Sequence, residues 1–226
     1  MKERGYPGKT DLRVIKTREA IKRSFLACLC EHKFEEISIK TITQKAKINR
    51  STFYKHYEDK YDLKNRYADE LIGGFVDNLE VTFLEKRILD TDSYYQELKI
   101  CLEQMREHKE EYLIFWNIRL PDRDVFQEMI EGGAAKLSGH ILDGSGIRTE
   151  KKKFSGLYTH LFLSTMMTSI RWWFTEGGFV ESDEFTWLML KHMQEGIWPT
   201  LKSQETFINQ TGRSYGRGPI GQSENK

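Results

Sequence analysis

One segment decides the fold: Phe34-Glu-Glu-Ile-Ser-Ile-Lys-Thr-Ile-Thr-Gln-Lys-Ala-Lys-Ile-Asn-Arg-Ser-Thr-Phe-Tyr-Lys-His-Tyr-Glu-Asp-Lys-Tyr-Asp-Leu63. Its apolar side chains are spaced as in two short helices joined by a tight turn over residues 46–49, with a buried wedge that fixes one helix against the other. The wedge consists of Ile42, Ala46, Ile48 and Phe53. We expect Ser38 to cap the first helix and Asn49 the second, because either side chain can accept from the free amides of a first helical turn.

The second of these helices predicts contact with double-stranded DNA. It begins with Arg50-Ser-Thr52, which puts basic and small hydroxyl side chains at an exposed helix N-terminus, where a recognition helix meets base edges. Residues 1–67 contain 17 Lys+Arg against 9 Asp+Glu, a net charge of +8, whereas residues 68–226 have a net charge of −7. Residues 1–67, here called the head, are thus basic, and the rest of the chain is acidic. This asymmetry indicates that the head alone binds a polyanion.

This stretch resembles the DNA-binding domain of the tetracycline-repressor (TetR/AcrR) family over about residues 13–70, on the run Phe53-Tyr-Lys-His-Tyr-Glu-Asp-Lys-Tyr-Asp-Leu63. The resemblance implies a role in DNA contact for nine residues. Arg50, Ser51, Thr52, Lys55 and His56 would face the major groove, Tyr54 and Lys60 would hold phosphates, and Lys40 and Thr41 would lie near the backbone or a base. Lys47 stands where the family usually has glycine, so we expect a left-handed lysine that costs about 1 kcal/mol.

The whole chain is predicted to be all-α, with about nine helices and no strand alternation. Residues 1–12 are predicted to form a flexible basic arm and residues 13–62 the helix-turn-helix domain. Residues 63–202 are predicted to form a regulatory and dimerisation domain, and residues 203–226 a disordered tail.

Helix limits follow from caps, glycines and periodicity. A helix from near Lys60 carries the apolar stripe Leu63, Tyr67, Leu71, Phe75, Leu79 and Phe83. After a turn at 90–93, helices are expected from Tyr94 to about His108 and from Glu110 to about Arg119. The next helix is expected to have Pro121 in its first turn and to run towards Leu142. The last two are expected from Glu150 to Glu176, with a stop at Gly177-Gly178, and from a cap at Ser182 to about Trp198.

Large side chains in the second half predict either an ordinary core or an apolar effector pocket between helices, with an arginine available for a carboxylate or phosphate. The candidate lining residues are Tyr112, Phe115, Trp116, Arg119, Phe162, Met166, Arg171 and Trp172. Such a pocket would take a small apolar or amphipathic effector. Gly73-Gly74, in mid-helix, is either a pivot or a point of close helix packing.

The run Ser169-Ile-Arg-Trp-Trp-Phe-Thr-Glu-Gly-Gly178, followed by Ser182-Asp-Glu-Phe185, resembles the C-terminal region of a TetR-like branch common in low-GC Gram-positive bacteria. The resemblance implies that the last two helices pair with their copies in a homodimer. Leu157, Leu161, Thr165, Thr168 and Trp172 lie along one side of the first helix, and Leu188, Lys191, His192 and Glu195 along the second.

Other classes of protein are disfavoured. The sequence contains no nucleophile elbow, dinucleotide fingerprint, zinc-protease motif or phosphate loop, so we expect no enzyme, cofactor or metal site. No apolar run is long enough to span a membrane and no signal segment is visible, which predicts a cytoplasmic protein. We therefore expect a homodimeric, ligand-responsive repressor that binds a palindromic operator. The alternative is a co-activator or anti-repressor that acts through a protein partner.

Overall fold

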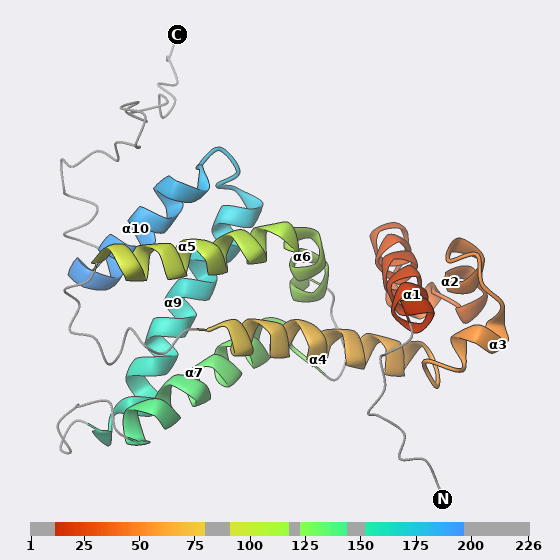
Figure 1. Cartoon of the computed structure of the whole chain (residues 1–226), viewed down its shortest axis with the longest axis horizontal. Coiled ribbons are helices and arrows are strands. Elements are labelled where there is room, and N and C mark those ends of the chain that lie inside the picture. Colours follow the sequence, from red (N-terminus) through yellow and green to blue (C-terminus); the bar gives the residue numbers. More distant parts are fainter. Residues whose placement is uncertain (1–11, 80–90, 118–122, 144–151, 197–226) are drawn as a thin grey trace, which may run out of the picture. The chain divides into compact units, whose positions relative to one another are not determined.

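The computed structural model describes residues 12–79, 91–117, 123–143 and 152–196. These ranges contain nine α-helices, one short 3-10 helix (η1) and no β-strand, as expected for an all-α protein (Figure 1). In chain order they are α1 (Leu12–Glu31), η1 (Phe34–Glu36), α2 (Ile39–Lys45), α3 (Arg50–Phe53), α4 (Lys60–Asn78), α5 (Thr91–Glu107), α6 (Lys109–Asn117), α7 (Val125–Asp143), α9 (Ser155–Thr175) and α10 (Ser182–Glu195).

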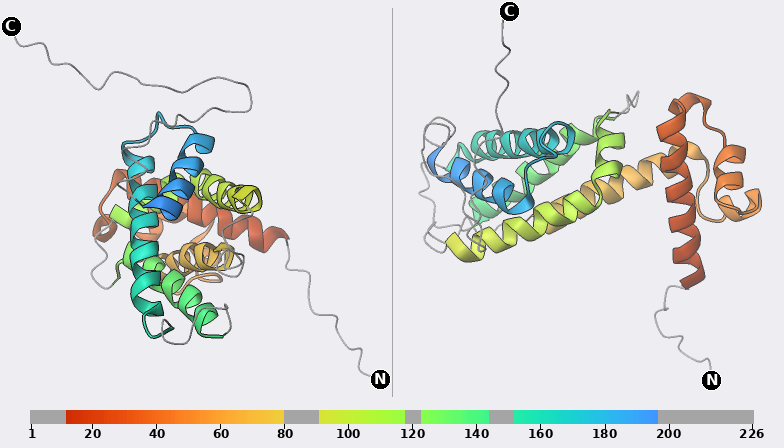
Figure 2. Two further views of the ribbon diagram at one scale, coloured as in Figure 1. Left: turned by 90° about the vertical axis from the view of Figure 1, so that its left-hand side faces the viewer. Right: turned by 90° about the horizontal axis from the view of Figure 1, so that it is seen from above.

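The first of two compact units comprises the described residues of Met1–Phe75 and Glu110–Met129. In it α2 packs against α1 and α3 against α2, a grouping visible in the right view of Figure 2. Phe34 lies at the centre, with its ring edge-on to Phe25 at 6.2 Å and to Tyr61 at 5.2 Å between centroids. Burial of such rings gives this small head an aromatic core in place of a disulfide or metal.

The second unit comprises the described residues of Val76–Lys109 and Ile130–Lys226, with its strongest helix contact between α5 and α10. Arg106 donates to Ser182 Oγ at 2.7 Å, and Tyr95 donates to Asp183 Oδ1 at 3.1 Å. The sequence predicts that Ser182 caps the last helix, and this prediction is wrong. The Ser182 hydroxyl instead accepts a hydrogen bond from Arg106 of α5. Glu181 occupies the N-cap position without a side-chain bond.

The starts of α5 and α7 differ from expectation. Helix α5 begins at Thr91, three residues before the expected Tyr94. Helix α7 begins at Val125, because the Asp124 carboxylate accepts from the amide of Gln127 at 3.0 Å. The expected start at Pro121 is therefore wrong, although Pro121 itself lies outside the described residues.

Helix ends also have local causes that the sequence indicated only in part. Helix α9 ends before Gly177 as expected, but the glycine is required for space: a Cβ there would lie 2.9 Å from Trp173 Cα. The last helix ends at Glu195, followed by Gly196 at φ 86°, before the predicted Trp198, which lies outside the described residues. The start of α9 at Ser155 is also later than the expected Glu150, itself outside those residues.

The apolar stripe of α4 is confirmed over the described residues, since Leu63, Tyr67, Leu71, Phe75 and Leu79 are all buried. Phe83 lies outside them. A Cβ added at Gly73 or Gly74 would meet nothing within 4 Å, so close packing does not explain this pair. Among the described helices, none has the length and apolar character needed to cross a membrane.

Candidate nucleic-acid interface

Local hydrogen bonds define the start of α2 and the turn that follows it. Ser38 Oγ accepts from the Thr41 amide at 3.1 Å, which confirms the expected cap. After Ala46 the chain reverses at Lys47, whose φ of 55° is in the left-handed region that the sequence predicted. The Ile48 amide then donates to Thr43 O at 3.0 Å and closes the turn.

The wedge between α2 and α3 is buried at its centre. Ile42 and Phe53 are completely buried, whereas Ala46 and Ile48 are half-buried. Tyr57, beyond the end of α3, is also buried, and this burial raises the pKa of its hydroxyl to about 12. The wedge predicted from the apolar spacing therefore holds the two helices as one unit.

The helix that follows the turn, α3, is short. It contains only Arg50–Phe53, and residues 54–56 continue as turns. Asn49 occupies the N-cap position, but its side chain makes no cap bond; its carbonyl accepts from the Thr52 amide at 2.9 Å. The expected Asn49 side-chain cap is therefore wrong.

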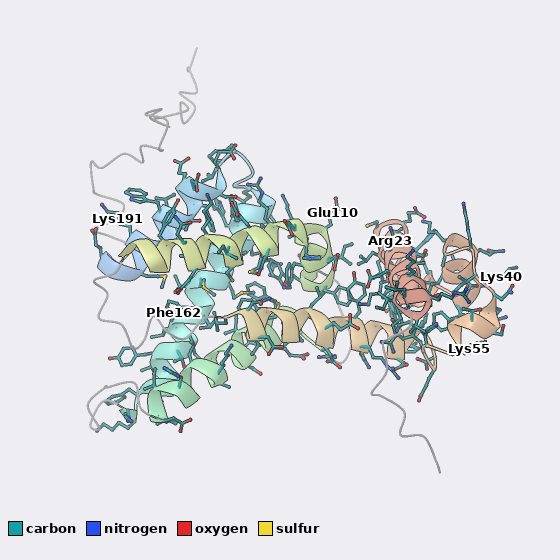
Figure 3. The ribbon with its side chains drawn as sticks, viewed as in Figure 1. Arg23, Lys40, Lys55, Glu110, Phe162 and Lys191 are labelled. Carbon is teal, nitrogen blue, oxygen red and sulfur yellow. The ribbon has the colours of Figure 1, made fainter. Side chains whose placement is uncertain are left out.

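Most of the candidate DNA contacts lie on the open side of this unit. Lys40, Arg50, Ser51, Tyr54 and Lys55 are exposed. Figure 3 shows Lys40 and Lys55 on the side of α2 and α3 that faces away from α1. Exposed cations at a helix start, on a rigid base, are suited to bind phosphates and base edges.

Three further candidates are half-buried: Thr41, Thr52 and His56. The Thr41 hydroxyl lies 2.9 Å from Ser38 Oγ and so takes part in the cap of α2. Burial, assisted by the nearby charges of Arg18 and Lys55, lowers the pKa of His56 below its ordinary value. A neutral ring at this position can donate one hydrogen bond and accept another.

Lys60 differs from the role that the resemblance implied. Its ammonium group donates to the carbonyl oxygens of Phe34, Glu35 and Ile37 at 2.9, 3.0 and 2.9 Å. An ammonium group has three protons, so none is left for a phosphate in this arrangement. Lys45 is also engaged, in an ion pair with Glu31 at 2.7 Å.

The candidate effector residues occur in both compact units. In the first, Tyr112 stacks on Trp116 with 5.3 Å between centroids, and Phe115 lies 5.1 Å from the Tyr67 ring. In the second, Met166 is buried and Phe162 and Arg171 are half-buried, whereas Trp172 is 40% exposed and lies edge-on to Phe179. Arg119 lies outside the described residues.

Trp172 therefore belongs to an exposed face of α9 and does not line an enclosed site. The other candidates fit an ordinary core as well as a pocket, so a single effector pocket remains a prediction.

Two interactions of α4 were not apparent from the sequence. Tyr67 donates to Glu111 at 2.8 Å, and Arg123, which also pairs with the nearby Glu128, forms an ion pair with Asp69 at 2.8 Å. These partners are up to 54 residues apart in the chain, so no local pattern indicates them. Within the described parts of the chain, no cluster of His, Cys, Asp or Glu has the makings of a metal site.

Comparison with known proteins agrees with this geometry. No family model matches the chain. A stretch of 80 residues is 36% identical to YxbF, an HTH-type transcriptional regulator of Bacillus subtilis (strain 168). The stretch makes up 35% of this chain and only 21% of that relative's length.

Solved structures of transcription regulators share the fold. The fatty acid degradation regulator FadR from Bacillus halodurans aligns with a TM-score of 0.59 over 87% of this chain and 99% of its own, at 15% identity. A TetR transcriptional regulator from Streptococcus agalactiae 2603V aligns with a TM-score of 0.50 over 80% and 95%, at 16% identity. The dihydroxyacetone kinase operon activator DhaS aligns with a TM-score of 0.53 over 80% and 93%, at 16% identity.

The all-helical fold with its helix-turn-helix is thus one that solved transcription regulators share. In particular, a solved TetR transcriptional regulator has this fold, as the resemblance of residues 34–63 implied. The relative and the structural neighbours described above are all named as regulators or activators.

Proposed function

We propose that this protein regulates transcription by binding an operator in double-stranded DNA, with α3 of each of two copies in a major groove. The observation that carries the proposal is the exposed start of α3. Arg50 and Ser51 are exposed, and they stand in the chain between the left-handed turn at Lys47 and the buried Phe53. A rigid base with free polar groups is the arrangement that sequence-specific readout requires.

Charge supports the same proposal. The side chains of Lys40, Arg50 and Lys55 make no hydrogen bond or ion pair within the described residues, so their charges are available to DNA. Neutralised phosphates release counterions, and the binding constant should therefore fall steeply with salt.

A homodimer is proposed through the outer face of α9. Leu157 and Leu161 are each 56% exposed and Trp172 is 40% exposed, one to several turns apart on the same helix. The small side chains of Thr165 and Thr168 lie between them and allow close approach of a second helix. A second copy that covered this row would remove its apolar surface from water.

Fewer residues of α10 are available to such an interface than the sequence predicts. Lys191 is already buried within its own chain, 3.8 Å from Glu195 and above the Trp187 ring. Leu188 and His192 are half-buried and remain available to a partner copy. A two-fold dimer of this kind would read half-sites about 34–36 Å apart or a multiple of that distance.

Response to a small apolar or amphipathic effector completes the proposal. It would act by binding two arrangements of the dimer with different affinity. Repression is the expected sign. Activation is the second candidate, favoured by the DhaS neighbour, which is named an operon activator. A reporter fused to the selected operator distinguishes the two by the direction of change on deletion of the gene.

The test of DNA readout begins with selection of binding sites from random duplex DNA. Competition binding on single-base variants of the selected site then compares Arg50→Ala with Lys40→Ala. Arg50→Ala should reduce discrimination at one base pair by about 10- to 100-fold, because a bidentate arginine–guanine contact is lost. Lys40→Ala should weaken all variants alike. Equal losses on every variant for both proteins, or no binding at low salt, would contradict the proposal.

A further inference from the structure

The carbonyl groups at the end of η1 need donors. A helix of three residues leaves its last carbonyl oxygens without partners inside the helix, and the chain then turns extended at Ile37, with φ −72° and ψ 127°. Phe34 O receives the Ile37 amide at 3.2 Å. An ammonium group from α4 satisfies what remains, because Lys60 Nζ binds Phe34 O, Glu35 O and Ile37 O together.

We propose that Lys60 is a positioning residue: its ammonium group clamps the residues before α2 to the start of α4, and it does not bind DNA phosphate. The clamp joins segments 23–26 residues apart. Ile37 O, one of its acceptors, immediately precedes Ser38, the cap of α2. The clamp thus fixes the point from which the helix-turn-helix is built.

The surroundings favour a compact cation in this position. Lys60 Nζ lies 4.8 Å from the centroid of the Phe34 ring and 5.6 Å from that of Tyr61. Both ring faces add to the attraction of the carbonyl oxygens. Three oxygens at about equal distance match the three protons of an ammonium group, whereas a guanidinium group is planar and presents its donors in a fork.

A phosphate ligand and a clamp predict opposite behaviour on substitution. Arginine is an excellent phosphate ligand, so Lys60→Arg would preserve a phosphate contact but not the clamp. Lys60→Met keeps most of the apolar stem and removes only the ammonium group. Lys55→Met is the matched control, since the Lys55 side chain is exposed and, among the described residues, makes no hydrogen bond.

The first measurement is thermal unfolding of the full chain without DNA, followed by circular dichroism. The clamp predicts that Lys60→Met and Lys60→Arg both lower the melting temperature by roughly 5–10 °C, while Lys55→Met leaves it unchanged. If Lys60→Met does not fold at all, Lys60→Arg carries the test. Wild-type melting of Lys60→Arg would overturn the clamp.

The second measurement is the salt dependence of binding to a mixed-sequence DNA duplex, and this part rests on the proposed function. Lys60→Arg should bind more weakly with an unchanged slope of log K against log salt, whereas Lys55→Met should reduce the slope by about 0.9. Full rescue of affinity by Lys60→Arg would overturn the proposal. If the wild-type protein fails to bind DNA, the proposed function fails, but the melting experiment still decides the clamp.

Discussion

Replacement of Lys47 by glycine should stabilise the protein, although it removes a charged residue from the surface. Lys47 is exposed and, among the described residues, is the one position other than glycine with a positive φ, at 55°. A side chain costs about 1–2 kcal/mol in this left-handed region. Glycine avoids that cost but gives back about 0.4–1 kcal/mol through the greater freedom of the unfolded chain. The expected net gain is therefore about 1 kcal/mol.

This gain is measured as thermal or denaturant unfolding of the full chain. For a protein of this size it corresponds to a rise in melting temperature of about 2–4 °C if unfolding is a single transition. Lys47→Ala is the matched control, because it removes the same charge and keeps the backbone strain. If glycine and alanine shift the melting temperature equally, the left-handed backbone is not the cause and the reasoning is refuted.

Three other predictions concern the rest of the chain. Gly73→Ala with Gly74→Ala should raise stability by about 1 kcal/mol per site, since both Cβ positions are open and glycine disfavours helix; loss of effector-dependent DNA release in the same variant would identify the pair as a pivot. Leu161→Glu on the exposed face of α9 should convert a dimer into monomers in sedimentation analysis. Stability should fall as pH drops through the range of Asp183, because its hydrogen bond to Lys99 holds the pKa of that carboxyl below the ordinary value.

Each of these has a control. Gly133→Ala should destabilise, since its Cβ would lie 3.0 Å from Leu163 Cδ1. Wild-type protein that is already monomeric at micromolar concentration would remove the basis of the Leu161 experiment and of the proposed dimer. Because the pKa of Asp183 is lower in the folded than in the unfolded chain, its contribution to stability is complete at pH values above the unfolded-state pKa. That contribution is lost as the pH falls through the lowered folded-state pKa. Asp183→Asn should flatten that acid dependence, and an unaltered acid profile would show that this ion pair contributes nothing.

The sequence predicted those parts of the structure that depend on neighbouring residues. The Ser38 cap and the buried stripe from Leu63 to Leu79 follow from local residue type and apolar spacing, whereas the left-handed Lys47 was expected from the family resemblance, which has glycine there. The end of α3 at Phe53 has no such signal, because residues 54–56 contain no glycine or proline and yet form turns.

The contacts that the sequence missed connect distant segments. The phosphate role of Lys60 rests on the family resemblance alone, and nothing nearby in the chain indicates the carbonyl oxygens of Phe34 and Ile37. Arg123 gave no signal for the same reason, since its partner Asp69 belongs to an earlier helix. Ser182 had the right composition for a cap, but Arg106 uses its hydroxyl.

The short length of α3 limits how many base pairs of an operator each copy can contact directly. Four helical residues rise about 6 Å, less than two base-pair steps of about 3.4 Å. One helix-turn-helix can thus distinguish few base pairs by direct contact, too few to specify a single operator in a genome. In the proposed dimer, the fixed spacing between the two half-sites would contribute as much to operator specificity as the base contacts within each half-site.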